Sequence, residues 1–316
     1  MITELQYVGI DVSKLRLDVH VHPPGEAFSS GNCRTGLLTL IAQLRHRNIA
    51  AVGLEASGGY EREAANLLVQ AGFTVHILDP AQVRAFARSM KTRAKTDPID
   101  AAMIARYVAA AHDVLIVHRP DAGLESVAVL NMYRRKLVEE RNGLRSLLET
   151  MTEPMVRRSL DRRMTVIGRE LLVLEREIKT RLAASPSLAA RSCLLRAVPG
   201  VGPVLTATLI AELPELGHIG AKRIASLAGV APHARQSGQT DRGGKCSGGR
   251  KPVRDVLYMA TLSAIKAKMP HLEPFYSRLR KAGKPFKKAL VAAMRKFLTI
   301  INAIVRDNAA FKYKPS

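Results

Sequence analysis

The chain has 316 residues, of which 47% are hydrophobic and 24% are charged. This composition supplies enough apolar side chains for a hydrophobic core and excludes a disordered tail, and the length indicates roughly two domains. Lysine and arginine total 49 residues against 27 aspartates and glutamates, which leaves a net charge of +22. Such an excess of positive charge predicts a polyanionic partner, and nucleic acid is the usual one.

Three further features exclude other classes of protein. Cys33, Cys193 and Cys246 lie far apart and are odd in number, so they predict no disulfide framework and no CxxC metal site, and a reducing cytosol fits them. The chain shows no charged-then-apolar leader and no apolar run of about 18 residues, so we expect neither secretion nor a membrane span. Aromatic residues are only 4% and tryptophan is absent. Binding by base stacking is therefore disfavoured, and contacts to phosphates and duplex shape are favoured.

The first part of the chain alternates strand and helix patterns. Period-two alternation over residues 5–21 predicts a β-hairpin. Further strands are predicted at 50–55 and 74–78, and helices at 37–46, 60–72, 80–89 and 98–112. This order predicts an α/β domain over residues 1–120.

Residues 121–186 have a different pattern, that of long helices. Apolar residues recur every seven positions and then at spacings of three and four, at Leu130, Leu137, Leu144, Met151, Met164, Ile167, Leu171, Leu174 and Ile178. The pattern predicts a helical hairpin or coiled-coil arm of about 45 Å, long enough to bridge subunits. Ordinary packing of two helices within the core is the alternative.

Residues 187–316 are predicted to be mostly helical. Two helices flank the turn at 199–202, which favours a helix-hairpin-helix whose Gly200 and Gly202 let backbone N–H groups approach a phosphate. A plain corner between two helices is the alternative. A loop rich in glycine and positive charge follows at 234–254, then helices at 255–269 and 286–306, the second of which begins with several lysines.

Four carboxylates stand at the ends of these predicted elements. Asp11 and Glu55 end strands, and Asp97 and Asp100 lie one turn apart where a helix starts. Such a set can hold two Mg²⁺ or Mn²⁺ ions, which clamp the attacking and leaving oxygens in phosphoryl transfer. Each carboxylate also has a structural alternative, as a helix cap for Asp97 and Asp100, a turn residue for Asp11, and a cap neighbour or ion-pair partner for Glu55.

Several segments resemble one family of proteins. YVGIDVSK at 7–14, GLEASGGY at 53–60 and KTDPIDAAMIA at 95–105 resemble the N-terminal domain of the IS110/IS1111 insertion-sequence transposases, also called DEDD transposases. PGVGPVLTATLIAEL and ASLAGVAPHARQSGQTDRGG resemble the C-terminal domain of the same family, the IS116/IS110/IS902 type. The resemblance covers nearly the whole chain in order. It implies a RuvC-like, RNase H-type fold in residues 1–120, with Asp11, Glu55, Asp97 and Asp100 as a catalytic tetrad that binds Mg²⁺ or Mn²⁺.

The resemblance also implies a serine nucleophile that forms a covalent phosphoserine link to DNA. The matching position is Ser237, and metal ions held by the tetrad would assist the attack. The residues alone leave Ser247, in the same loop, as an alternative. The serine and the carboxylates fall in different predicted domains, so we expect a composite site, and the arm would join a dimer or tetramer.

Two groups of basic residues adjoin the candidate sites, and we expect them to contact phosphates without reading sequence. They are Arg84, Arg88, Lys91, Arg93 and Lys95 before the tetrad helix, and Arg242, Lys245, Arg250 and Lys251 around the serine loop. A solvated charged surface is the alternative for any one of them. No zinc finger or homeodomain pattern is present, and the family resemblance implies that a structured non-coding RNA (bridge RNA) pairs with donor and target DNA.

The family resemblance implies an insertion-sequence transposase or recombinase in the bacterial cytoplasm, associated with the nucleoid. A site-specific DNA invertase of the same family is the nearest alternative. A RuvC-like junction nuclease that uses water as nucleophile is another, and a stable protein–DNA adduct would exclude it. A non-catalytic architectural protein would bind DNA without Mg²⁺.

Overall fold

The computed structural model describes residues 4–90, 97–233, 236–237, 240–241, 245–246 and 248–311, without the side chains of 97–99, 233, 236–237, 240–241 and 245. The chain divides into two compact units, residues 1–120 and 121–316.

Unit 1 is built on a mixed five-stranded sheet. Its strands are β1 (Gln6–Val12), β2 (Arg16–His22), β3 (Glu26–Gly31), β4 (Ile49–Glu55) and β5 (Val75–Leu78), in the order β3-β2-β1-β4-β5. β1, β2 and β3 form an antiparallel meander, whereas β4 is parallel to both β1 and β5. The predicted hairpin is confirmed, and the mixed sheet is consistent with an RNase H-like fold. β3 was not predicted because its sequence, EAFSSG, has no buried residue and no regular alternation.

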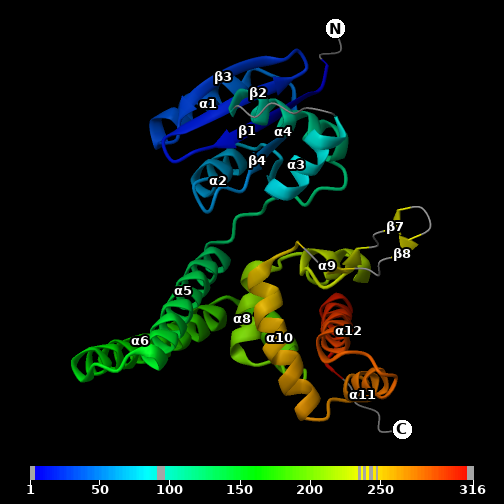
Figure 1. The fold of residues 1–316 in the computed structure, drawn as a ribbon. Helices are drawn as coiled ribbons and strands as arrows, with labels where there is room; N and C mark the ends of the chain where they lie inside the picture. The colour runs from blue at the N-terminus through cyan, green and yellow to red at the C-terminus, as the bar shows by residue number, and fades with distance from the viewer. Residues whose placement is uncertain are drawn as a thin grey trace. The chain divides into compact units, whose positions relative to one another are not determined.

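Helices cover both faces of this sheet (Figure 1). On one face, α1 (Arg34–Arg45) and α2 (Arg62–Gln70) pack on the apolar side chains of the central strands. On the other face lie α3 (Pro80–Ser89) and α4 (Asp97–Ala111), and α4 contacts β1, β2 and β4. The strand residues that face α4 include Gly9, where an added Cβ would lie 2.2 Å from the Ala101 carbonyl oxygen. The backbone of α4 therefore rests directly on β1.

Unit 2 begins with an antiparallel helical hairpin, α5 (Ala122–Thr150) and α6 (Pro154–Ala184). Their contact is apolar along its length and includes Leu137, Leu144 and Leu171, all from the predicted repeats. Ion pairs such as Arg134–Glu175 and Arg163–Glu140 cross the hairpin at its edges. Val127 and Leu182, near the base of the hairpin, join the core of the following helices. The predicted helical hairpin is confirmed, and coiled-coil pairing of this arm stays a prediction.

The rest of unit 2 is helical apart from two short strand pairs. The helices are α7 (Pro186–Arg196), α8 (Pro203–Glu212), α9 (Ala221–Leu227), α10 (Lys251–Lys266), α11 (Glu273–Lys281) and α12 (Phe286–Arg306). α8 is apolar around nearly its whole circumference and therefore lies inside the bundle. β6 (Pro232–His233) pairs with β9 (Lys245–Cys246), and β7 (Gln236–Ser237) pairs with β8 (Thr240–Asp241).

One boundary in unit 2 corrects the sequence analysis. α10 starts at Lys251, so the predicted loop over 234–254 was wrong at its end, because Pro252 sits in the first turn where proline is favourable. The predicted helix at 286–306 matches α12. Within the described ranges, no helix is long and apolar enough to cross a membrane.

Candidate functional site

Asp11 and Glu55 lie side by side at the carboxyl ends of two parallel strands. Ile10 of β1 pairs with Leu54 of β4, and each carboxylate is the next residue along its strand. Neighbouring strands are about 4.8 Å apart, and paired residues point to the same face. Both side chains are partly buried, and both interact with neighbouring groups.

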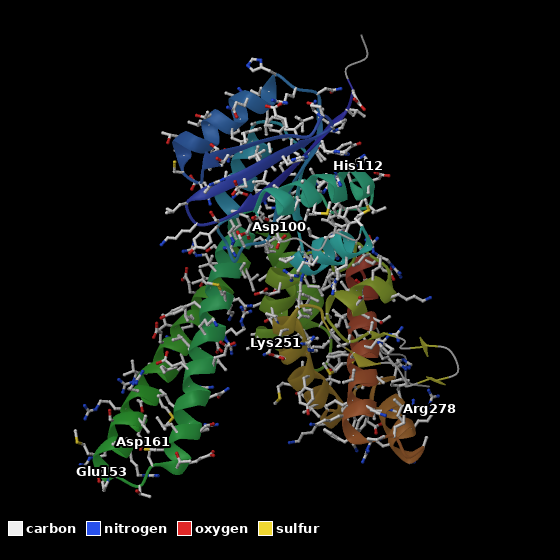
Figure 2. The ribbon with its side chains drawn as sticks, turned by 45° about the horizontal axis from the view of Figure 1, so that its top comes forward. Asp100, His112, Glu153, Asp161, Lys251 and Arg278 are labelled. Carbon is white, nitrogen blue, oxygen red and sulfur yellow. The ribbon has the colours of Figure 1, made fainter. Side chains whose placement is uncertain are left out.

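The direction of α4 brings its first turn to the same end of the sheet. The ring of Tyr7, near the start of β1, lies 5.0 Å from the ring of His112, just after α4. Gly9 contacts α4 at Ala101. The helix therefore runs back along β1, and its first turn lies toward Asp11, about 6.6 Å beyond Gly9. Figure 2 shows Asp100 and His112 at opposite ends of α4.

The structure thus gathers three of the four predicted carboxylates at one end of the unit 1 sheet. Carboxylate oxygens are the ligands that Mg²⁺ prefers, so Asp11, Glu55 and Asp100 fit such an ion by their chemistry. Among the side chains that the structure describes, no group of three Asp, Glu, His or Cys is arranged to hold a metal. The Asp97 side chain lies outside the described residues. Metal binding by the tetrad therefore stays a prediction.

A further carboxylate, Asp18, lies beside Asp11 and escaped the sequence analysis. Asp18 of β2 pairs in register with Asp11, so it faces α4 as well, and it is 7% exposed. The Arg16 guanidinium donates to its Oδ1 at 2.9 and 2.5 Å. The alternation RLDVHVH, with apolar residues on one face of β2, was a signal for placing Asp18 and His20 on the other. The ion pair offsets one negative charge beside Asp11.

His20 follows Asp18 on the same face of β2, opposite Gly9. Burial lowers the pKa of His20, and the nearby charges of His22 and of Arg106 on α4 lower it further. These effects favour the neutral form of the His20 imidazole. The face under α4 thus carries polar side chains from both strands of the hairpin.

The segment with Ser237 contains two short strand pairs. Ser237 of β7 pairs with Thr240 of β8 in an antiparallel register. The Ser237 side chain, Ser247 and Arg242 lie outside the described residues, as does the Lys245 side chain. The choice between the two serines therefore stays a prediction.

Backbone contact closes the base of this segment. We call residues 227–229 and 248–250 the loop base. A Cβ added at Gly249 would lie 2.3 Å from the Gly229 nitrogen, and both glycines have positive φ, +68° and +69°. The Arg250 N–H donates to the Leu227 carbonyl at 2.7 Å. Arg254 adds a hydrogen bond to the Gly248 carbonyl. The two ends of the segment are therefore held together.

Arg250 fastens this loop base to the bundle. Its guanidinium donates to both carboxylate oxygens of Glu215, at 2.5 and 2.6 Å, and to the Glu212 carbonyl at 2.9 Å. Glu215 is only 7% exposed. We predicted that Arg250 contacts nucleic acid, whereas the structure engages its guanidinium within the fold. No local pattern indicates this pairing, because Glu215 lies in an irregular segment 35 residues before Arg250.

The turn between α7 and α8 gives its two glycines different settings. Gly200 has φ +85°, and an added Cβ would lie 2.5 Å from the Ala264 Cβ of α10. Packing therefore accounts for Gly200. Gly202 precedes α8 and has open space beside it. Phosphate contact at this turn stays a prediction.

The remaining predicted phosphate contacts differ in how far the structure describes them. Arg84 and Arg88 are exposed on α3, where the Arg88 side chain donates to the Arg84 carbonyl. Lys251 is exposed and pairs with Asp255 one turn later. Lys91, Arg93 and Lys95 lie outside the described residues.

Comparison with known proteins identifies related sequences along nearly the whole chain. A model of DEDD transposases of the IS110 type matches residues 8–153, and a model of the IS116/IS110/IS902 transposases matches residues 192–277. The pilin gene-inverting proteins of Moraxella lacunata and Moraxella bovis are each 29% identical over 320 residues, covering 96% of this chain and 97% of theirs. An uncharacterised protein of insertion element IS116 from Streptomyces clavuligerus is 25% identical over 386 residues, covering 98% of this chain and 96% of its own.

Proposed function

Because the chain belongs to the IS110 family of transposases, we propose that it cuts and rejoins DNA with the four carboxylates of unit 1 and a serine of unit 2. The observation that carries this proposal is the meeting of Asp11, Glu55 and the first turn of α4 at one end of the sheet. An ordinary structural role for Asp11 and Glu55 would not require both at the same register position.

The carboxylates serve the reaction by holding Mg²⁺ or Mn²⁺. Asp11, Glu55, Asp97 and Asp100 would be the ligands, and the bound ions supply positive charge to a phosphate that is being displaced. The Arg16–Asp18 ion pair adjoins Asp11 and limits the negative charge around it. α4 orients Asp100, and its close seat on Gly9 fixes that orientation.

Ser237 is the proposed nucleophile. Its Oγ bonds to a DNA phosphorus while one phosphorus–oxygen bond to deoxyribose breaks, and the serine proton leaves with the released hydroxyl. The phosphoserine ester conserves the bond, so attack by another DNA hydroxyl rejoins the strand and restores the serine. The loop base supports this role because it holds both ends of the serine segment against the bundle.

Trapping the covalent adduct tests this chemistry. DNA from the ends of the native element, labelled and nicked so that religation fails, would be incubated with protein, its flanking RNA and Mg²⁺, then run under denaturing conditions. We expect an adduct with the wild type and with Ser247→Ala, but none with Ser237→Ala or Asp11→Asn. An adduct that persists in Ser237→Ala and is absent in Ser247→Ala would identify Ser247 as the nucleophile instead. Cleavage without any adduct would favour a junction nuclease.

A site-specific invertase is the second candidate. The pilin gene-inverting relatives favour it, because they align with this chain over nearly the full length of both proteins. A reporter flanked by the native sites in inverted and in direct orientation separates the two functions. An invertase flips the inverted reporter, whereas a transposase moves the element to a second plasmid.

We also propose that an RNA encoded beside the gene directs the choice of DNA. The support is the family and the large positive charge, +22, with few aromatic residues. Sequencing of RNA that copurifies with the protein tests this point. A single structured RNA supports it, and random RNA that salt removes contradicts it.

The arm is proposed to join copies of the chain. Val166, Leu172 and Val173 of α6 are 55%, 57% and 61% exposed, although the adjacent apolar residues Ile167, Leu171 and Leu174 of the same helix are buried. Val173→Lys should therefore shift the mass measured by light scattering from dimer or tetramer to monomer. Arg169→Gln, on the same helix, is the control that keeps the assembly.

A further inference from the structure

The helices α11 and α12 carry far more positive charge than negative charge. Residues 273–306, which span α11 and α12, contain nine lysines and arginines and a single acidic residue, Glu273. We call eight of these cations the α11–α12 basic surface: Arg278, Arg280, Lys281, Lys284, Lys287, Lys288, Arg295 and Lys296. α11 and α12 pack against each other (Figure 1), and Arg278 projects from α11 in Figure 2. Positive charge from two helices therefore forms one surface.

Among the described residues, the cations of this surface have no acidic partners of the kind that cations have on the arm of unit 2. On the arm, Arg134, Arg163 and Arg181 each pair with a glutamate. Within the described part of the chain, no ion pair involves any of the eight cations of the basic surface. Ion pairing therefore does not account for their presence.

Packing and helix stability do not explain the presence of these cations either. The buried face of α12 consists of residues such as Leu290, Met294 and Phe297, whereas Lys287 and Lys288 are exposed. These two lysines stand in the first turn of α12, which has no acidic residue and no side-chain cap. Positive charge at a helix N-terminus is unfavourable because it meets the positive end of the helix dipole. The two lysines therefore reduce helix stability slightly, and this cost favours a role in binding a ligand.

Part of the surface is held in a fixed arrangement. The Phe275 ring lies 5.6 Å from the Arg278 guanidinium carbon and 4.6 Å from the Lys296 Nζ, so one ring holds cations from both helices. The Arg280 guanidinium donates to the Lys284 carbonyl at 2.7 Å and steadies the turn between the helices. A surface that keeps its charges in place loses less side-chain freedom when it binds a polyanion.

The basic surface adjoins the serine segment. Burial raises the pKa of the Cys246 thiol on β9, and the positive charges of Arg295 and Arg254 act against this rise. Arg295 of α12 therefore lies near β9. α12 also packs on α9, next to the loop base. The positive charge therefore extends from α11 along α12 to the segment that carries Ser237.

We propose that the α11–α12 basic surface binds the phosphate backbone of duplex DNA that flanks the strand held at the serine segment. This inference rests on the proposed function, because it takes DNA as the partner. It also goes beyond the family match, since the IS116/IS110/IS902 model ends at residue 277 and all nine lysines and arginines of residues 273–306 follow that position. Lys284, Lys287 and Lys288 are exposed at the turn and at the start of α12, and their ammonium groups suit phosphates, so we expect them to contact the backbone without sequence readout.

Binding to a short DNA duplex at several salt concentrations tests the proposal, with full-length protein carrying Ser237→Ala and no Mg²⁺. Failure of the catalytic proposal then leaves this measurement unaffected. The triple variant Lys284→Gln, Lys287→Gln, Lys288→Gln should lower the slope of log affinity against log salt by about 3. Its affinity should fall at least tenfold at low salt. Replacing the same residues with arginine should restore binding.

The arm supplies a matched control. Arg158, Arg162 and Arg169 are exposed on α6, and changing all three to glutamine removes the same total charge. Affinity for DNA should then change less than threefold. An equal loss in both triple variants would show that only net charge matters and would overturn the proposal. Unchanged DNA binding in the variant with Lys284, Lys287 and Lys288 replaced by glutamine would overturn the proposal as well. So would a loss of binding that is confined to an RNA duplex of the same length.

Discussion

At the scale of single residues, Arg250 could either contact nucleic acid or stabilise the fold, and stability measurements separate these two roles. Its guanidinium bonds both oxygens of the nearly buried Glu215, whereas the neighbouring Lys251 meets only Asp255 on the exposed face of α10. Removal of one partner from such a pair leaves the other charge without compensation in a dry setting. Arg250 therefore contributes to the fold of unit 2, and Lys251 remains free to contact a phosphate in exchange for Asp255.

We expect Arg250→Gln to lower the free energy of unfolding by about 2 kcal/mol, a value reduced from that of a fully buried pair because the Arg250 side chain is 34% exposed. Lys251→Gln removes the same charge and should leave stability unchanged while weakening DNA binding in a salt-dependent way. Urea unfolding and DNA binding of both variants provide the measurement. Unchanged stability of Arg250→Gln with weaker DNA binding would return Arg250 to the role predicted from sequence.

His76 makes the stability of unit 1 depend on pH. The side chain is 1% exposed, its Nδ1 lies 3.0 Å from the Ile116 carbonyl oxygen, and its Nε2 has no partner among the described groups. Burial lowers the pKa of His76 below its usual 6.5. Well above pH 6.5 the imidazole is neutral in both the folded and unfolded states. Below it, the unfolded chain binds the proton more readily, so stability falls as pH decreases.

We therefore expect unit 1 to melt at a lower temperature at pH 5 than at pH 7. His76→Gln should flatten this dependence, even though it lowers the melting temperature at pH 7. His20→Gln is the comparison, because burial and nearby charge also lower the pKa of His20, which is more exposed. An unchanged pH dependence in His76→Gln would assign the effect to other groups.

At the scale of elements, the close packing of α4 on β1 determines where the carboxylates meet. Gly9 permits the approach, since any side chain there would overlap the α4 backbone at Ala101 and Ala105. The first turn of α4, with Asp100, reaches the Asp11 end of the sheet only if the helix lies this close. The geometry of the candidate site is therefore set by a residue that carries no functional group.

Gly9→Ala should displace α4 and lower the free energy of unfolding by about 1–3 kcal/mol. It should also abolish formation of the DNA adduct, because the carboxylates separate. Gly143→Ala is the control, since Gly143 lies on α5 with nothing near its Cβ position, and alanine should stabilise that helix by up to about 1 kcal/mol. Full adduct formation by Gly9→Ala would mean that α4 tolerates the shift.

Elements with strong periodicity were predictable from the sequence, and elements without it were not. Alternation located β1 and β2, and the repeats located α5 and α6. β3, α9 and α11 were missed, and α11 has no buried residue to reveal it. Asp11, Glu55 and Asp100 were predicted as a group, but their meeting depends on parallel pairing of β1 with β4, which no local pattern encodes. Asp18 was missed although the alternation of β2 and the predicted hairpin carried the signal for placing it beside Asp11.

At the scale of the whole molecule, the chain contains separate hydrophobic cores. The cores of unit 1 lie on the two faces of the sheet and draw on residues before 120, whereas the large core of unit 2 joins α7 to α12 with the base of the arm. Cooperative unfolding follows shared packing, so residues in one core should unfold together. Substitutions in different cores should then act on different transitions.

Calorimetry of the full chain should accordingly show two transitions. Gly9→Ala should lower the temperature of one, and Arg250→Gln should lower the temperature of the other, with each variant leaving the second transition within about 1–2 °C of its wild-type value. Moving from pH 7 to pH 5 should lower the same transition as Gly9→Ala, because His76 belongs to unit 1. A single transition that both variants shift would show that the two units unfold as one, and the stability effects of Gly9 and Arg250 could then no longer be assigned to separate parts of the chain.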